Sequence, residues 1–222
     1  MISPINLFKI DGYAFENPEA SEHQKPLVSF LKEIRESSSR GYNAVDSEVS
    51  PHIKANLYES NFSLFRRKNE SLEQLKRFIG HSMLEVAKHR NSSVNEKNLQ
   101  LMFKESWFHI TRHGGYHGPH RHPNCAWGGL YYVDIGEATK ENGSNTFYNP
   151  QEALCTDVAS QSHTATSIEP RNGHLFIFPS YLLHDAKVYS GEKERIVISF
   201  NALLLENEQP LKGRGAIHKE GV

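Results

Sequence analysis

Histidines are concentrated in one short stretch of the chain, and the spacing of two of them suits a metal site. Five of the thirteen histidines lie between His109 and His122. If His120 and His122 lie on a β-strand, both point to the same face, because side chains two residues apart do so. Two imidazoles on one face can bind one metal ion, and imidazole suits Zn, Cu, Fe and Ni. A third ligand must come from elsewhere in the chain, and His184 is the candidate.

A second polar pattern begins at Arg195. If the run from Arg195 to Asn201 is a strand, Arg195, Ser199 and Asn201 share one face, and the opposite face is apolar. A polar face inside a barrel is costly unless something polar fills the interior. An arginine there favours a carboxylate or phosphate bound in bidentate contact. The alternative is an arginine at the rim, paired with Asp185 or Glu192.

The elements that must position these residues are short strands. After residue 99, runs of apolar, aromatic and β-branched residues alternate with Gly, Pro and Asn. Such runs indicate an all-β core of the jelly-roll type. The N-terminal part predicts an edge strand or hairpin within residues 1–20, followed by two helices. The first carries an apolar stripe from Leu27 to Ile34. The second begins at a capping box, Ser71 to Gln74, and runs to about His89.

The fold class predicted is therefore mainly β with N-terminal helices (α+β), around a jelly-roll core. A chain of 222 residues is long enough for one domain with a substantial core. We expect a single domain over residues 1–222. It comprises a mixed N-terminal helical part (1–99), a β core (100–205) and a polar tail (206–222).

Composition argues against several classes of partner. The formal net charge is −1 with both signs mixed, so neither nucleic acid nor an anionic membrane is expected as a partner. The two cysteines give no disulfide framework and no cysteine-based zinc module. We expect no secretion signal, because the first residues show no basic region followed by an apolar run, and no apolar stretch approaches membrane-spanning length. The expected location is the cytoplasm.

Three motifs in order resemble the 2-oxoglutarate/Fe(II)-dependent oxygenases. They are Gly-Gly-x-His-x-x-His-x-His-Pro from residue 114, Gly-x-Leu-x-x-Phe-Pro-Ser-x-x-x-His from residue 173, and Arg-x-x-x-Ser-Phe-Asn from residue 195. The resemblance covers roughly residues 100–203. It is strongest to a largely uncharacterised branch of bacterial and phage members with a His-x-His-Pro motif. It implies that the jelly roll is a double-stranded β-helix that binds Fe(II) and 2-oxoglutarate.

The resemblance also assigns roles by position. The metal ligands it implies are His120, His122 and His184. The arginine that binds the far carboxylate of 2-oxoglutarate falls on Arg195, with Ser199 beside it on the same face. A phenol hydrogen bond to the co-substrate could come from Tyr132 or Tyr116.

One position departs from the family pattern. Most members have Asp or Glu where this chain has His122, and the usual facial triad is two histidines and one carboxylate. Neither Asp134 nor Asp185 falls at the expected carboxylate position. A three-histidine site has one negative charge less and would hold Fe(II) less tightly. Alternatively, only His120 and His184 bind the metal, and His122 orients a ligand or a water.

The function predicted is a 2-oxoglutarate-dependent dioxygenase that oxidises a small molecule or an amino-acid side chain with O₂. Two alternatives use the same jelly roll. One is a zinc hydrolase with the same three histidines, although no acidic residue lies in the His-x-His stretch to act as a base. The other is a cupin-like or metabolite-binding module without catalysis. The sequence predicts neither the substrate nor the oligomeric state.

Overall fold

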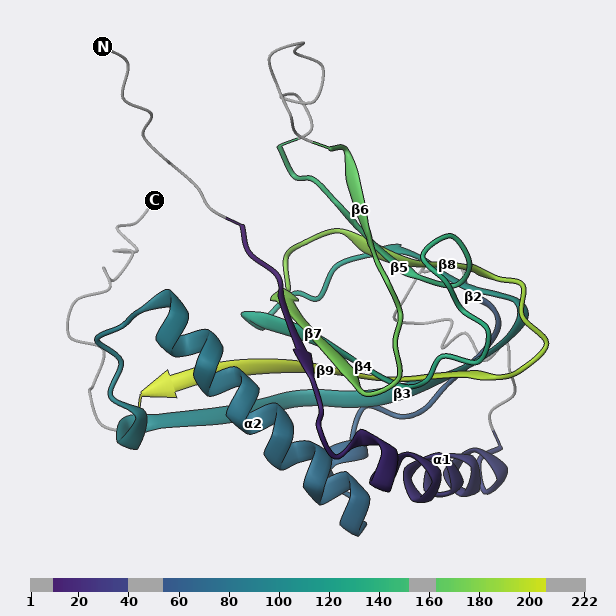
Figure 1. Cartoon of the computed structure of the whole chain (residues 1–222), viewed down its shortest axis with the longest axis horizontal. Helices are drawn as coiled ribbons and strands as arrows, with labels where there is room; N and C mark the ends of the chain where they lie inside the picture. Colours follow the sequence, from purple (N-terminus) through teal and green to yellow (C-terminus); the bar gives the residue numbers. More distant parts are fainter. Residues whose placement is uncertain (1–9, 40–53, 152–162, 207–222) are drawn as a thin grey trace, which may run out of the picture.

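The computed structural model describes residues 10–39, 54–151 and 163–206 (Figure 1). Two helices, α1 and α2, and two short 3₁₀ turns accompany nine strands in this part of the chain. The helices and turns are α1 (Ala20–Glu36), α2 (Glu70–Arg90), Leu64–Arg66 and Glu96–Asn98. The strands are β1 (Tyr13–Glu16), β2 (Lys54–Glu59), β3 (Leu99–His120), β4 (Trp127–Asp134), β5 (Asn145–Tyr148), β6 (Ala165–Ile168), β7 (His174–Pro179), β8 (His184–Tyr189) and β9 (Arg195–Glu206).

All strand pairs are antiparallel, in the order β1-β7-β4-β9-β3-β8-β5-β6, and β2 pairs with β3. Strand β3 bends from one half of this sheet into the other. Its first part, from Leu99 to Thr111, pairs with β9, and its last part, from Gly115 to His120, pairs with β8. Gly114 lies at the bend with φ of 75°, a left-handed conformation that glycine adopts without steric cost. The bend curls the sheet into a jelly roll and carries the histidine-rich stretch into its interior.

Two apolar clusters lie on opposite faces of the central strands. The larger joins both helices to the outward face, with Leu31 and Leu72 packed in one cluster with Phe108, Ile198 and others. The smaller fills the inward face and contains Leu130, Tyr132, Phe147, Phe178, Leu182 and Val197. Figure 1 shows both helices on one side of the layer formed by β7, β4, β9 and β3. The predicted mainly β fold with N-terminal helices outside a jelly-roll core is confirmed.

The helices differ in detail from the sequence prediction. The N-cap of α2 is Asn69, whose side chain accepts a hydrogen bond of 3.1 Å from the backbone of Leu72. Ser71 lies inside the first turn and is buried, so the proposed capping box was wrong by two residues. Both Asn and Ser are good caps, and only the backbone conformation decides between them. Helix α1 starts well before Leu27. Its first turns are polar, so the apolar stripe marks only the later part of the helix.

Strand β2 begins in a stretch, residues 43–56, whose polar and irregular sequence did not indicate a strand. β1 lies at one edge of the sheet, as predicted for the N-terminal segment. The predicted polar tail beyond residue 206 lies outside the described residues. Among the described helices, none has both the length and the apolar character needed to cross a membrane.

Candidate metal centre

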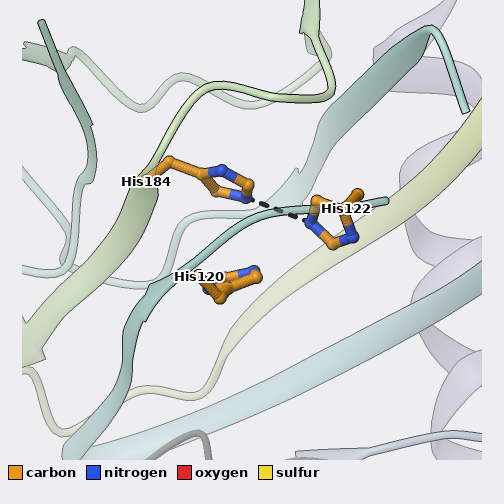
Figure 2. A group of neighbouring side chains, drawn as sticks. All are labelled: His120, His122 and His184. Atoms are coloured by element: carbon orange, nitrogen blue, oxygen red, sulfur yellow. Dashed lines mark hydrogen bonds between the residues drawn. The ribbon is translucent and has the colours of Figure 1, made fainter. Parts of the chain in front are cut away.

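Three histidines converge where β3 ends and β8 begins. His120 is the last residue of β3 and His184 the first of β8, and the two are directly paired across the strands. His122 lies two residues beyond the end of β3, in the connecting segment just before a turn. One ligand nitrogen of each ring lies within 4.8 Å of the others, as Figure 2 illustrates. The convergence arises from the chain's turn and not from a continuous strand through His122, which was the premise of the sequence argument.

Two of the rings are oriented by backbone carbonyls. Nδ1 of His120 lies 2.9 Å from the carbonyl oxygen of Gly118, and Nδ1 of His184 lies 2.9 Å from that of Leu182. A carbonyl oxygen only accepts, so each Nδ1 carries the proton and donates it. The lone pair of each neutral ring is then on Nε2. Such a hydrogen bond on the far nitrogen is the usual way to fix the tautomer and orientation of a metal-binding histidine.

Aromatic neighbours hold the same two rings in place. The ring of His117 stacks on His120 with centroids 3.9 Å apart and planes 17° apart. Phe147 stacks on His184 at 5.4 Å and 19°, and Phe178 meets that ring edge-on at 4.8 Å. His120 and His184 are 8% and 2% exposed. Rings held by aromatic packing and by a backbone hydrogen bond present their Nε2 atoms in a defined geometry before any ligand binds.

His122 is held by different contacts. Its backbone N–H donates to the carbonyl of Ser180 at 3.1 Å, and its ring lies against Trp107 with centroids 5.4 Å apart. Trp107 therefore packs on a ring of the histidine cluster. Nδ1 of His122 is 3.4 Å from Nδ2 of Asn201, which donates to Glu105 at 2.7 Å. The orientation of that amide bears on which nitrogen of His122 carries the proton.

The three nitrogens suit a transition-metal ion. Nε2 of His122 and Nε2 of His184 are 3.2 Å apart (Figure 2). Two imidazoles that bind one ion at about 2.0–2.1 Å and roughly right angles place their nitrogens about 3 Å apart. His120 approaches the same point, with its ring centroid 4.3 Å from that of His184. Neutral nitrogen donors of this kind suit Fe(II) as well as Zn(II).

Arg195 lies inside the barrel and lines the same cavity as the three histidines. Its side chain is buried, with 2% exposure. Nη2 donates to Oδ1 of Asn145 at 2.8 Å, and the guanidinium carbon lies 5.7 Å from the ring centroid of Tyr132. Nε is buried and has no hydrogen-bond partner in the described part of the chain. The guanidinium therefore retains unused donor capacity within the barrel.

The positive charge of Arg195 has no carboxylate partner within residues 10–39, 54–151 and 163–206. The alternative partners considered from the sequence are engaged elsewhere. Asp185 accepts a hydrogen bond of 2.6 Å from the hydroxyl of Tyr148, and Glu192 lies 3.4 Å from His113 at the surface. Burial lowers the pKa of Arg195, because the charge is disfavoured where it lies. An anionic ligand would offset that cost, so the site fits a carboxylate.

The other predicted co-substrate residues divide into two groups. Ser199 is buried at 3% exposure and lines the cavity with Arg195. Tyr132 does not line it, and its hydroxyl donates to Oδ1 of Asn145 at 3.0 Å. Burial raises the pKa of Tyr132 to about 12, so the hydroxyl stays protonated and able to donate. Tyr116 is not among the cavity-lining residues.

Several cavity residues escaped the sequence argument. Asn145 accepts from both Arg195 and Tyr132, yet a single asparagine at the start of a strand gives no signal of that role. His109 and His117 also line the cavity. They belonged to the histidine-rich stretch, but their separation of eight residues does not indicate a shared site.

Comparison with known families gives one match. Residues 105–201 match the family model described as "Putative 2OG-Fe(II) oxygenase", where 2OG is 2-oxoglutarate. This match contains all three histidines and Arg195, and covers less than half of the chain. It supports placement in the superfamily of 2-oxoglutarate/Fe(II) oxygenases. It agrees with the prediction of Fe(II) and 2-oxoglutarate as cofactors. No match to a curated protein was found.

Solved structures share the fold at low sequence identity. A prolyl-4-hydroxylase from Pseudomonas putida is 13% identical, with 86% of this chain and 92% of that chain covered, and a TM-score of 0.57. A prolyl hydroxylase from Trichoplax adhaerens, in complex with a hypoxia-inducible-factor peptide, is 14% identical. The match covers 86% of this chain and 82% of that chain, with a TM-score of 0.58. HygX from Streptomyces hygroscopicus, with nickel and 2-oxoglutarate bound, is 12% identical. The match covers 87% of this chain and 82% of that chain, with a TM-score of 0.55. The class of fold is thus the double-stranded β-helix of these oxygenases.

Proposed function

We propose that this chain is an Fe(II)- and 2-oxoglutarate-dependent dioxygenase that hydroxylates or otherwise oxidises a small molecule or an amino-acid side chain. The observation that carries the proposal is the buried Arg195, which has no carboxylate partner in the described residues and shares a cavity with three convergent histidines. A zinc hydrolase would need the histidines but gives no reason for a buried arginine beside them. A 2-oxoglutarate site needs both.

In this proposal, His120 and His184 bind Fe(II) through Nε2, and His122 is the third ligand. When bound, Fe(II) and 2-oxoglutarate supply an O₂-dependent oxidation in which 2-oxoglutarate becomes succinate and CO₂. The carbonyl acceptors at Gly118 and Leu182 keep Nδ1 of the two strand histidines protonated. Their Nε2 lone pairs are therefore available without any change of tautomer.

Arg195 anchors the far carboxylate of 2-oxoglutarate, with Ser199 on the same face as a second donor. Asn145 and Tyr132 act behind the arginine. Tyr132 donates to Asn145, and Asn145 accepts from Nη2 of Arg195. The arrangement fixes the plane of the guanidinium, so its remaining N–H groups meet the carboxylate in a set direction. A planar, preorganised fork is what distinguishes arginine from lysine in carboxylate binding.

The range of proposed substrates rests on two kinds of neighbour. The Trichoplax structure holds a peptide fragment, and a second structure of HygX holds hygromycin B. Both a side chain of a peptide and a small molecule are therefore compatible with this fold. O₂ is the other substrate. Nothing in the chain favours nucleic acid, because the charge is balanced.

The direct test is succinate release from 2-oxoglutarate by the purified protein, with Fe(II), with Zn(II) and with a chelator, across small molecules and peptides. Succinate release is expected with Fe(II) but not with Zn(II) or the chelator, and it should be lost in Arg195→Ala. A matched control is Arg112→Ala, which removes an arginine that is half exposed and paired with Glu194 at the surface. Absence of turnover together with unaltered 2-oxoglutarate binding in Arg195→Ala would contradict the proposal.

A further inference from the structure

A second group of potential metal ligands adjoins the first. The ligand atoms of Glu59, His109 and His117 lie within 4.8 Å of one another. Nε2 of His109 is 2.7 Å from Oε2 of Glu59. His109 and His117 are 8% and 5% exposed, and the carboxylate side chain of Glu59 is 11% exposed. Two imidazoles and one carboxylate are thus gathered in a largely buried site outside the His120, His122 and His184 cluster.

An irregularity in the pairing of β2 and β3 brings this group together. Glu59 and His109 face each other as paired residues of the two strands. His117 would lie about 26 Å from His109 along a regular strand, at about 3.3 Å per residue. Instead the pairing jumps from Leu57 with Thr111 to Ala55 with Tyr116, so that residues 112–115 oppose Asn56 alone. The excess residues loop out, and the rings of His109 and His117 come within 5.5 Å between centroids.

The bulge requires unusual backbone on both strands. Asn56 has φ of 44° and Gly114 has φ of 75°, both in the left-handed region. The side chain of Asn56 donates to the carbonyl of His113 at 3.1 Å and closes the bulge. A Cβ on Gly115 would lie 2.6 Å from the carbonyl oxygen of Asn56, so the backbones approach too closely for a larger residue. Such conformations persist where the surrounding structure imposes them, often at functional sites.

We propose that Glu59, His109 and His117 bind a second divalent transition-metal ion, separate from the iron of the proposed oxygenase. Two histidines and one carboxylate form the donor set found in facial-triad metal sites. A Glu59–His109 ion pair alone needs no third residue, whereas the bulge places a second imidazole beside that pair. Burial favours metal binding as well, because a buried carboxylate is stabilised when it coordinates a cation.

The second ion would act on the first site through one contact. The ring of His117 stacks flat on His120, the predicted iron ligand. A metal that fixes His117 would also fix the plane against which His120 rests. The two histidines of the second cluster line the same cavity as the first cluster, so the stacked rings of His117 and His120 connect the two sites. The site does not depend on 2-oxoglutarate, so it can be tested without any turnover.

The test is the number of metal ions bound by metal-free protein titrated with Co(II), measured by equilibrium dialysis and elemental analysis. Wild type is expected to bind two equivalents. Glu59→Gln and His109→Ala should each bind one, His184→Ala should also bind one, and His109→Ala/His184→Ala should bind none. His113→Ala removes an exposed histidine of the same strand and should still bind two. Circular dichroism confirms that each variant is folded.

The outcomes separate the two sites. One equivalent in wild type, lost in His184→Ala and kept in His109→Ala, would overturn the second site and leave the proposed iron site standing. One equivalent lost in His109→Ala and kept in His184→Ala would support the second site and contradict the iron assignment. The wild-type count needs no variant, so misfolding of a variant does not remove the test.

Discussion

Oδ1 of Asn145 accepts a hydrogen bond of 2.8 Å from Nη2 of Arg195. The same oxygen accepts from the hydroxyl of Tyr132, and the amide nitrogen of Asn145 donates to the backbone carbonyl of Asp185 at 3.1 Å. All four hydrogen-bonding groups lie in or next to the barrel interior. Asn145 therefore fixes the orientation of a buried cation while leaving its charge uncompensated, which preserves the attraction of Arg195 for an anion.

Replacement of Asn145 should weaken 2-oxoglutarate binding. Asn145→Ala removes a hydrogen bond to a charged group, worth about 1.5–3 kcal/mol, which corresponds to roughly 10–100-fold in the dissociation constant. Asn145→Asp should weaken binding further, because its carboxylate would neutralise Arg195. Isothermal titration with 2-oxoglutarate measures both, and Asn98→Ala, at an exposed asparagine, is the control. Equal losses in the two Asn145 variants would argue against the electrostatic account.

Replacement of Arg195 itself should have the larger effect. Truncation of one partner of a buried guanidinium–carboxylate pair costs about 2–5 kcal/mol. Since about 2 kcal/mol corresponds to roughly 30-fold, Arg195→Ala should weaken 2-oxoglutarate binding by well over tenfold, while metal binding is retained. Arg195→Lys keeps the charge without the planar fork and should recover only part of the loss. An unchanged dissociation constant in Arg195→Ala would remove the arginine from the site.

The cavity residues differ in how far their positions could be predicted from the sequence. The alternation of β9 was enough to place Arg195 and Ser199 together. The apolar face of that strand packs against the helices, so the polar face that carries both residues lines the cavity. The pairing of Asn145 with Arg195 was not accessible from sequence. It joins residues 50 apart on strands that are not neighbours in the sheet, and only the closed barrel brings them together.

The histidines show the same limit. The distal His184 was identified from its motif, and its place beside His120 follows from the pairing of β3 with β8. Glu59 lies 50 residues before His109, and nothing in the sequence states that the two are cross-strand partners. The bulge that brings His117 to the site depends on the left-handed backbone of Asn56, which the sequence does not indicate. The neighbouring Gly114 and Gly115 on the opposite strand are the sequence features that suggest an irregularity there.

Loss of either strand histidine should remove the proposed iron. His120→Ala and His184→Ala each delete an Nε2 donor that a backbone carbonyl has oriented. We expect Fe(II) affinity to fall by more than the roughly 10–100-fold that loss of an orienting partner of a metal ligand costs. Anaerobic Fe(II) titration followed by elemental analysis measures the effect, and His81→Ala on the exposed surface of α2 is the control. Full retention of iron in both variants would contradict the site assignment.

Tyr132 should make stability fall at alkaline pH. Burial raises its pKa to about 12, whereas a tyrosine of the unfolded chain ionises at about 10. Between about pH 10 and pH 12 the unfolded state has lost this proton and the folded state keeps it, so the free energy of unfolding decreases with pH. The contribution is about 2–3 kcal/mol, at about 1.4 kcal/mol per unit.

Urea unfolding at about pH 9 and about pH 11.5, on either side of the ordinary tyrosine pKa, tests that dependence. Wild type should lose more stability between the two pH values than Tyr132→Phe, which has no ionisable group at this position. The variant starts from a lower value because its hydrogen bond to Asn145 is missing. Parallel losses in the two proteins would show that Tyr132 does not carry the dependence.

The last prediction concerns His122, at which the family usually has a carboxylate. If His122 binds the metal through Nε2, its Nδ1 must carry the proton, and Nδ2 of Asn201 cannot then donate to it. An Asn201 amide that turned Oδ1 toward His122 would give up its hydrogen bond to Glu105. Oδ1 of Asn201 is buried and has no hydrogen-bond partner among the described residues, so it would be the acceptor for Nδ1 in that turned amide. In the structure, Nδ2 of Asn201 lies 3.4 Å from Nδ1 of His122 and faces it as a donor. In that arrangement His122 carries its proton on Nε2 and donates to Nε2 of His184.

These two states predict different responses to His122→Asp. If His122 is a ligand, the introduced carboxylate would restore two histidines and one carboxylate, so Fe(II) should stay bound with equal or higher affinity. X-ray absorption at the metal edge counts imidazole ligands directly, with Glu59→Gln as the background so that the second proposed site is not counted. Three imidazoles in that background, falling to two with His122→Asp, support direct ligation. Two in both would assign His122 to hydrogen bonding with His184, and its loss should then cost about 10–100-fold in affinity.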